Sequence, residues 1–281
     1  MMGSFIIENA INTCYIDSLL VSLFYKTSII DSVLNKDLKN ATGLYLQEYI
    51  KERFVNLIRT NTSILQDDIE MIRTICSQLG WLNVDEYMNQ QDVTEFYCFL
   101  MDTFEIEKLT IQRRTLTDTT ISNLVGDKEV IPYIPLHLPE SEQPSTIKGM
   151  ITQWQYDNIS TITNQQNNCL NSYTILNSPF LIGFAINRFN NKGIRIRTSV
   201  IIQKKIHLNE KKTEEWNFHA AICHKGDTLK SGHYYTLIAI SDTSWYIFDD
   251  LCVPCMREVR MDDPKVTNMI KKECVFVLYR K

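Results

Sequence analysis

Hydrophobic positions in the first hundred residues recur every three or four residues, which is the spacing of an amphipathic helix. This pattern predicts helices at Cys14 to Lys26, Leu46 to Ile58, Ile69 to Leu79 and Val93 to Phe104. Gly80 stands where the third helix should end. In the fourth, Glu95 and Asp102 fall opposite the apolar stripe, and Asp92 lies at its border.

From about Val130 the helical period gives way to β-branched and aromatic runs bounded by turn-forming residues, which predict strands. The predicted strands are Ile131 to Leu138, Phe180 to Phe189, Ile194 to Leu208, Phe218 to His224, Tyr234 to Ile240, Trp245 to Phe248 and Cys274 to Tyr279. The polar stretch from Gln155 to Ser172 predicts a loop. Helices followed by a mostly antiparallel sheet predict an α+β fold whose two lobes meet along a cleft.

Composition narrows the class of protein. The 281 residues are 44% hydrophobic and 22% charged, as in soluble globular proteins, and the net charge of -4 provides no basic field for nucleic acid. No apolar run reaches the roughly 20 residues of a bilayer span, and the first residues lack the features of a secretory signal. The 8 scattered cysteines favour a reducing compartment. We therefore expect an intracellular protein, cytoplasmic or nuclear, without a nucleic-acid or membrane partner.

Segments at opposite ends of the chain supply a thiol, an imidazole and a carboxylate, the groups of a cysteine protease. Cys14 lies at a predicted helix start, where free N–H groups and the helix dipole favour a thiolate. His233 follows Gly232 at the start of a predicted strand. Asp249 and Asp250 follow the next apolar strand, which can bring a carboxylate to His233.

Each of these signals also has a simpler interpretation. Cysteines are usually small buried hydrophobes, and we interpret Cys76 and Cys98, on or beside apolar helix faces, in that way. A single histidine can be a surface or core residue, and two adjacent acids can belong to a turn. The combination of the three groups in the order Cys, His, Asp is much more specific than any one of them.

The motifs Asn9-x-x-Asn-Thr-Cys-Tyr, Gly-His-Tyr-Tyr and Trp-Tyr-x-Phe-Asp-Asp resemble the cysteine and histidine boxes of the ubiquitin-specific proteases, which are papain-like deubiquitinating enzymes. Gln90 to Phe96 is similar to the Gln-rich helix of that family. Fainter likeness extends the resemblance over nearly the whole chain. It implies one catalytic domain over residues 1–281, with a helical thumb at about 1–108 and reduced fingers and a β palm at about 109–281.

The resemblance also implies catalytic roles. Cys14 would be the nucleophile, and His233 the general base and later the acid. Asp249 would orient the imidazole, with Asp250 as a possible helper. Asn9 matches the asparagine whose amide helps to bind the oxyanion.

The implied substrate is ubiquitin, attached to another protein through its C-terminal glycine. Tyr234 would form a wall of the channel that admits glycine. Gln90, Asp92 and Glu95 would contact the basic tail, with carboxylates accepting hydrogen bonds from its arginines. Acids on a helix are otherwise usually just a solvated face. No cofactor is implied, and we expect a monomer although the sequence leaves the oligomeric state open.

The chain departs from the family at the zinc site that many members carry in their fingers. Cys169 is the one cysteine in that interval, so the four-cysteine site cannot form and the fingers should be shortened. Cys252 and Cys255 have zinc-like spacing but supply two ligands of four, so no metal is expected. Asp17 and Val21 stand where the cysteine box often has Asn and Gln.

Three functions remain open. The first is an active deubiquitinase. The second is a catalytically silent scaffold that binds ubiquitin, and the third is a thiol protease for another ubiquitin-like modifier. A purely structural or assembly protein is a more remote alternative.

Overall fold

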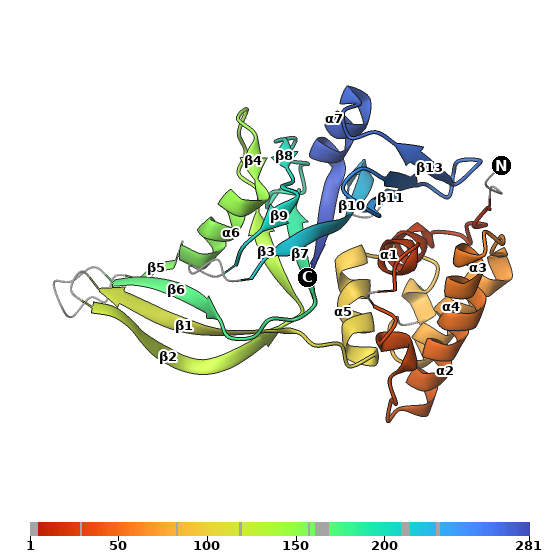
Figure 1. Cartoon of the computed structure of the whole chain (residues 1–281), viewed down its shortest axis with the longest axis horizontal. Coiled ribbons are helices and arrows are strands. Elements are labelled where there is room, and N and C mark those ends of the chain that lie inside the picture. Colours follow the sequence, from red (N-terminus) through yellow and green to blue (C-terminus); the bar gives the residue numbers. More distant parts are fainter. Residues whose placement is uncertain are drawn as a thin grey trace. The chain divides into compact units, whose positions relative to one another are not determined.

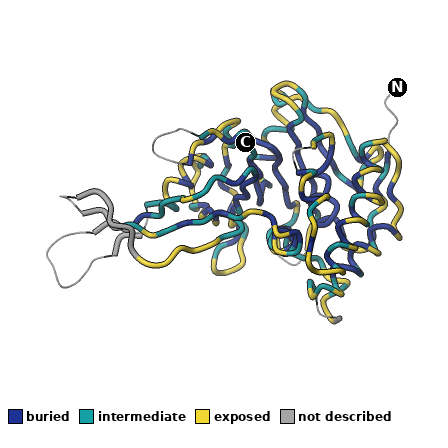
Figure 2. Tube along the Cα trace, turned by 60° about the horizontal axis from the view of Figure 1, so that its bottom comes forward, coloured by how far each residue is buried: buried dark blue, intermediate teal, exposed yellow. Residues whose placement is uncertain are grey.

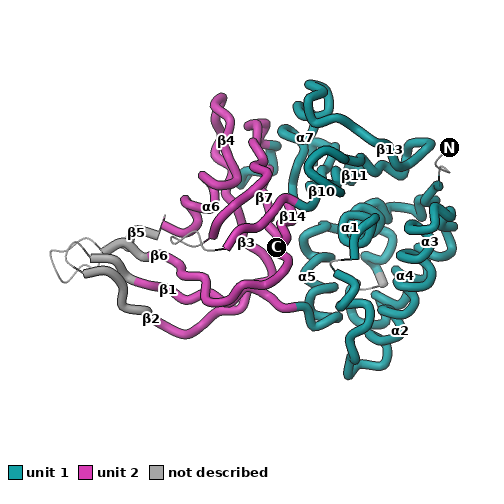
Figure 3. Tube along the Cα trace, viewed as in Figure 1, with its two compact units in different colours: residues 1–106, 189–195, 219–276 teal, residues 107–188, 196–218, 277–281 magenta. Residues whose placement is uncertain are grey.

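The computed structural model describes residues 5–28, 30–82, 84–117, 120–156, 158–160, 169–208, 214–228 and 231–281. The fold is α+β, with helices first and strands afterwards (Figure 1). Contacts divide the chain into two compact units (Figure 3). Unit 1 comprises residues 1–106, 189–195 and 219–276, and unit 2 comprises residues 107–188, 196–218 and 277–281.

The helices of unit 1 before residue 106 lie where the apolar period predicts them, whereas α7 (Pro264–Glu273), also in unit 1, was not predicted. Those before residue 106 are α1 (Cys14–Phe24), α2 (Ala41–Ile50), α3 (Asn56–Arg59), α4 (Gln66–Gln78) and α5 (Val93–Thr103), with short helical turns at Val33–Asn35 and Val84–Glu86. The second predicted helix begins earlier, because the Asn40 side chain caps it by accepting the Thr42 and Gly43 N–H groups. It continues through a π-helical turn, Lys51–Val55, into α3.

Burial follows the predicted faces of these helices (Figure 2). Every residue of α1 is buried, and α1 contacts α5. The buried face of α5 is the predicted apolar stripe, whereas Glu95 is exposed. Tyr15 of α1 meets Phe96 of α5 edge to face, with ring centroids 5.3 Å apart. After α4, Gly80 takes a positive φ of 85°, which agrees with its predicted role as a helix stop.

An antiparallel meander completes unit 1, except for residues 216–218 and 277–280 at its ends, which belong to unit 2. It runs through β10 (Trp216–Thr228), β11 (Ser231–Ala239), β12 (Trp245–Phe248) and β13 (Met256–Val259), followed by α7 (Pro264–Glu273) and β14 (Cys274–Arg280). β11 pairs with β10 on one side and with β12 on the other. It also contacts α1, which brings the start of the chain to the middle of the meander.

Unit 2 contains a four-stranded sheet with the order β2-β1-β6-β5. Its strands are β1 (Leu109–Thr117), β2 (Thr120–Ile131), β5 (Asn158–Ser160) and β6 (Cys169–Ile175). Two parallel pairs join β3 (Tyr133–His137) to β7 (Leu181–Asn187) and β4 (Ser145–Thr146) to β8 (Val200–Ile201). The helix α6 (Ile147–Tyr156) and the short strand β9 (Lys205–Ile206) complete the unit.

The predicted loop from Gln155 to Ser172 was partly wrong. α6 extends to Tyr156, β5 begins at Asn158 and β6 begins at Cys169; residues 161–168 lie outside the described part of the chain. Polar residues form strands here because β1 supplies the hydrogen-bonding partner of β6, which a local pattern cannot reveal. Conversely, the long strand predicted at Ile194 to Leu208 is reduced to β8 and β9. No helix among the described residues is long and apolar enough to cross a bilayer.

Candidate active site

Cys14 contacts the segment of β11 that carries His233. Cys14 is the first residue of α1, and the backbone N–H of Tyr234 in β11 donates a hydrogen bond to its Sγ at 3.4 Å. His233 directly precedes Tyr234, so the thiol and the imidazole come from adjacent structural positions. Both residues belong to unit 1.

The imidazole of His233 faces both acids predicted from the sequence. Its Nε2 lies 2.8 Å from Oδ1 of Asp249 and 3.4 Å from Oδ1 of Asp250. The pairing of β11 with β12 explains this geometry, because both acids directly follow β12. Because Nε2 faces the two carboxylates, Nδ1 lies on the other side of the ring.

The two acids have different electrostatic environments. Burial raises the pKa of Asp249, but the hydrogen bond and positive charge of His233 outweigh it and hold the pKa below its usual value. Burial dominates at Asp250 and keeps the pKa of that carboxyl above its usual value, although His233 and Asn9 favour its charged form. Of the two carboxyl groups, Asp249 is thus the one that ionises more readily.

Asn9 approaches the site through Asp250. Its Nδ2 donates a short hydrogen bond to Oδ2 of Asp250. An asparagine amide has two N–H donors, so this contact leaves one of them for another acceptor. The structure thus brings together Cys14, His233, Asp249, Asp250 and Asn9.

Burial changes the expected state of the Cys14 thiol. Burial raises its pKa to about 12; the Tyr234 N–H opposes this shift, and the charges of Asp250 and Asp17 add to it. The helix start was expected to favour a thiolate, so that expectation was wrong for this conformation. The thiol is protonated at neutral pH and needs a base to become a nucleophile.

His224 is a neighbour of the site that the sequence did not single out. It is buried in β10, and its ring centroid lies 4.6 Å from that of Tyr234. Burial and the charge of Arg195 lower its pKa to about 4, so the ring is neutral at physiological pH. The signal that could have found it is register, because His224 is the β10 partner of Tyr234.

The residues predicted to bind substrate gather near His224, with one exception. Gln90 Nε2 lies 3.1 Å from Nε2 of His224, and Tyr234 is buried against the same ring. Asp92 caps α5 by accepting the Thr94 N–H at 2.6 Å, and its charge also raises the pKa of the Tyr234 phenol, after the larger effect of burial. Glu95 lies on the exposed side of α5.

Gly232 lets the strand that carries His233 pass close to His224. A Cβ at Gly232 would lie 2.3 Å from Nε2 of His224 and 2.7 Å from the carbonyl oxygen of Lys225. Side-chain atoms do not approach ring or backbone atoms so closely, so no other residue fits here without displacement. The ring of His224 occupies the space that a side chain at position 232 would need.

In the described part of the chain, one group has the spacing to hold a cation. His233, Asp249 and Asp250 each offer an atom, and these atoms lie within 4.8 Å of one another. His233 Nε2 already forms a hydrogen bond with Asp249, so the same spacing also fits a hydrogen-bonded histidine–carboxylate pair without a cation. Cys255 is buried with its Sγ donating to the Phe5 carbonyl, so it is already engaged elsewhere.

Replacing Gly232 by alanine should destabilise the protein by about 1–3 kcal/mol, because the new methyl group overlaps the His224 ring. Gly43 in α2 is the matched control. A Cβ there meets its neighbours at 3.6 Å or more, so Gly43→Ala should stabilise by about 0.5–1 kcal/mol. Urea unfolding of both variants tests the pair. Equal effects would contradict the close approach at Gly232.

The free protein should alkylate slowly at Cys14 near neutral pH. Because the thiol pKa is raised to about 12, the thiolate fraction and the rate of reaction with iodoacetamide should rise about tenfold per pH unit between pH 7 and 9. Peptide mass mapping separates Cys14 from the partly exposed Cys252. A rate that is already constant below pH 7 would show that the thiolate forms in the free protein.

Comparison with known proteins agrees with the motifs. A search of the curated proteins found no sequence match. Among solved structures, the chain resembles the SAGA DUB module of Ubp8, Sgf11, Sus1 and Sgf73 bound to monoubiquitin, with a TM-score of 0.71 and 12% sequence identity. That alignment covers 99% of this chain and 69% of the other, and it confirms the α+β fold. The model of the ubiquitin carboxyl-terminal hydrolases matches residues 6–278, so this chain belongs to that family.

Proposed function

We propose that this chain is a deubiquitinase, which hydrolyses the peptide or isopeptide bond after the C-terminal glycine of ubiquitin through an acyl-enzyme. The observation that carries the proposal is the pair of contacts around His233. The Tyr234 N–H reaches Cys14 Sγ at 3.4 Å, and Asp249 holds Nε2 of His233 at 2.8 Å. In a chain of the ubiquitin carboxyl-terminal hydrolase family, this thiol–imidazole–carboxylate arrangement supports cysteine peptidase chemistry.

His233 would move the protons of the reaction. Nδ1 takes the proton of the Cys14 thiol, while the Nε2–H donates to Asp249 and stabilises the imidazolium that forms. The sulfur attacks the glycine carbonyl, the C–N bond breaks, and the leaving amine takes the proton from His233. Water, deprotonated by His233, then attacks the thioester and releases the ubiquitin carboxylate and the thiol.

Asn9 would stabilise the oxyanion in both steps. One of its amide hydrogens is held by Asp250, which fixes the orientation of the amide, and the second is available for the developing negative charge. Asp250 would therefore help through Asn9 as well as through its charge near His233. Removal of one such donor typically lowers kcat by a factor of about 10²–10³.

The basic tail of ubiquitin would approach along the start of α5. Asp92 and the exposed Glu95 provide carboxylates for arginines, and Gln90 provides an amide beside His224. The buried ring of Tyr234 would close one side of the channel beside Cys14. Glycine has no side chain, so the C-terminal glycine of ubiquitin would fit a channel that the large ring of Tyr234 narrows.

A catalytically silent ubiquitin-binding scaffold is the second candidate. The observation that favours it is the burial of Cys14 with a thiol pKa raised to about 12. A protease for another ubiquitin-like modifier uses the same residues and remains the third candidate. Chemical capture distinguishes all three.

Purified protein should form a covalent adduct with ubiquitin that carries a C-terminal electrophile. Cys14→Ala should abolish capture because it removes the nucleophile, and His233→Ala should slow it strongly while ubiquitin still binds. Gel shift measures capture, and calorimetry measures binding. Binding without capture would support the scaffold. Capture only by probes built on another modifier would support the third candidate.

Replacing Asp92 by asparagine should weaken ubiquitin binding about tenfold or more, because a charge-assisted contact to the tail is lost. Asparagine is as good a helix cap as aspartate, so α5 and the thermal stability should be unchanged. Affinity is measured in the Cys14→Ala background. Asp102→Asn, near the other end of the helix, is the matched control. Equal affinities of the two variants would remove Asp92 from the contact surface.

A further inference from the structure

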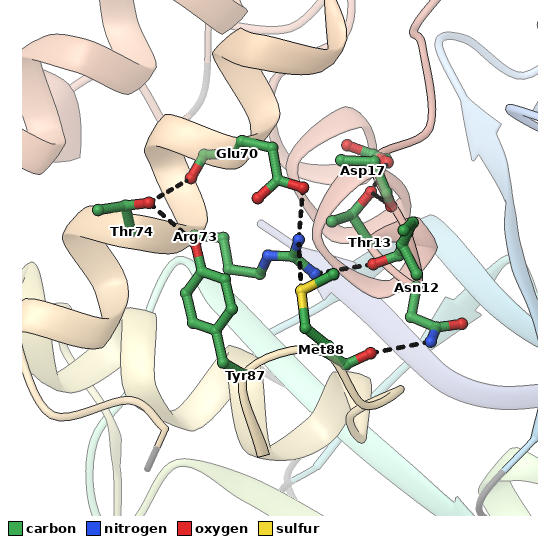
Figure 4. Close-up of polar contacts among 10 residues, drawn as sticks. Asn12, Thr13, Asp17, Glu70, Arg73, Thr74, Tyr87 and Met88 are labelled. Carbon is green, nitrogen blue, oxygen red and sulfur yellow. Dashed lines mark hydrogen bonds and ion pairs between the residues drawn. The ribbon is translucent and has the colours of Figure 1, made fainter. Parts of the chain in front are cut away.

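Arg73 is a fully buried cation on α4 that the proposed chemistry does not use (Figure 4). Its Nη1 donates to the carbonyl oxygen of Ile11 at 2.7 Å. Its Nη2 pairs with Oε1 of Glu70 at 2.5 Å and lies 3.6 Å from Sδ of Met88. These partners place the guanidinium between α4 and the loop that precedes Cys14.

The loop at Ile11 and Asn12 depends on polar contacts. The Ile11 side chain is 58% exposed, so it does not anchor the loop by packing. Asn12 has a positive φ of 60°, which is uncommon for non-glycine residues but is adopted by asparagine more readily than by most of them. Two hydrogen bonds hold this turn. Arg73 donates to the Ile11 carbonyl oxygen, and the side-chain amide of Asn12 donates to the Met88 carbonyl oxygen at 2.9 Å.

Arg73 also supports the second of these contacts. Its guanidinium lies 4.7 Å from the centre of the Tyr87 ring, next to Met88 in the chain. The Tyr87 hydroxyl lies 2.8 Å from Oγ1 of Thr74 on α4, which holds the ring in place. Arg73 therefore contacts the loop directly and also the segment to which the loop is tied.

Burying an arginine is costly because its charge loses contact with water. The Nε of Arg73 has no hydrogen-bond partner among the described residues. An apolar side chain would fill the same space without that cost. The rest of α4 already packs through buried Ile69, Ile72 and Ile75, so the helix does not need Arg73 for its core.

We propose that Arg73 is a positioning residue for hydrolysis, which fixes the Ile11 carbonyl and thereby sets the place of the Asn9 amide relative to Cys14. Asn9 is two residues before Ile11, and Cys14 is three residues after it. A rotation of the Ile11 peptide group would therefore change the position of the Asn9 amide relative to the sulfur of Cys14. This role rests on the proposed deubiquitinase function, in which Asn9 and Cys14 act on the same carbonyl group.

The test replaces Arg73 by methionine, an unbranched apolar side chain that can fill the buried space without the charge or the hydrogen bonds. Turnover of ubiquitin with a C-terminal fluorogenic amide should show kcat lowered by about 10- to 100-fold, since misplacement by about 1 Å costs rates of that order. KM should change less than about twofold, because Arg73 is not expected to touch ubiquitin. Affinity for ubiquitin in the Cys14→Ala background should likewise be unchanged.

Glu70→Gln is the matched control. It removes the charge that pairs with Arg73 but keeps an oxygen acceptor and leaves the contact with Ile11 intact, so kcat should stay near that of the wild type. Arg73→Lys keeps a donor of shorter reach, so its kcat should lie between those of Arg73→Met and the wild type. Circular dichroism and thermal unfolding report the folded fraction of each variant, to which kcat is normalised.

A folded Arg73→Met with wild-type kcat would overturn the proposal. A loss of kcat that only follows the unfolded fraction would do so as well. If neither Arg73→Met nor Arg73→Lys folds, Arg73 is required for the fold and the positioning role is wrong. A wild-type protein without turnover would instead refute the proposed function, so the two failures are distinguishable.

Discussion

The contact between α1 and β11 is the constraint on which the candidate site depends. It places a main-chain N–H, that of Tyr234, on the sulfur of Cys14. Because the donor belongs to the backbone, this contact is independent of the side chain at position 234. The neighbouring pairing of β11 with β12 then fixes where the two acids meet the imidazole. One helix and two strands are thus sufficient to assemble the thiol, the ring and the carboxylates.

Buried ionisable groups surround Cys14 and affect the protonation state of its thiol. Asp17 lies one helical turn after Cys14, and its carboxyl pKa is raised, first by burial and then by the charge of Asp250. Thr13 donates to Asp17 at 3.2 Å, and the charge of Arg73 also favours the ionised form. The negative charges of Asp250 and Asp17 add to the effect of burial and oppose a thiolate at Cys14. The free protein therefore holds the Cys14 thiol in the protonated state at neutral pH.

Sequence patterns predicted the parts of the fold that depend on local periodicity. α5 and β12 lie almost where the apolar spacing placed them, since each buries one face or run against the core. The strands β1, β2 and β6 escaped prediction because they are rich in polar residues. β1 and β2 pair as a hairpin, and β6 pairs with β1 from a distant part of the chain. At the site, residue types and order predicted the groups that meet. The protonated state of Cys14 and the burial of His224 arise from packing, which no local pattern specifies.

The interrupted order of unit 1 has a consequence for how the protein is made. Three separate stretches of chain compose this unit, and residues of unit 2 are synthesised between them. The sulfur and the N–H that meets it are 220 positions apart. Cys14 therefore leaves the ribosome long before any residue of β11 exists. The nascent chain carries an isolated thiol during most of translation, and the candidate site can assemble only once β11 and β12 have been translated and folded.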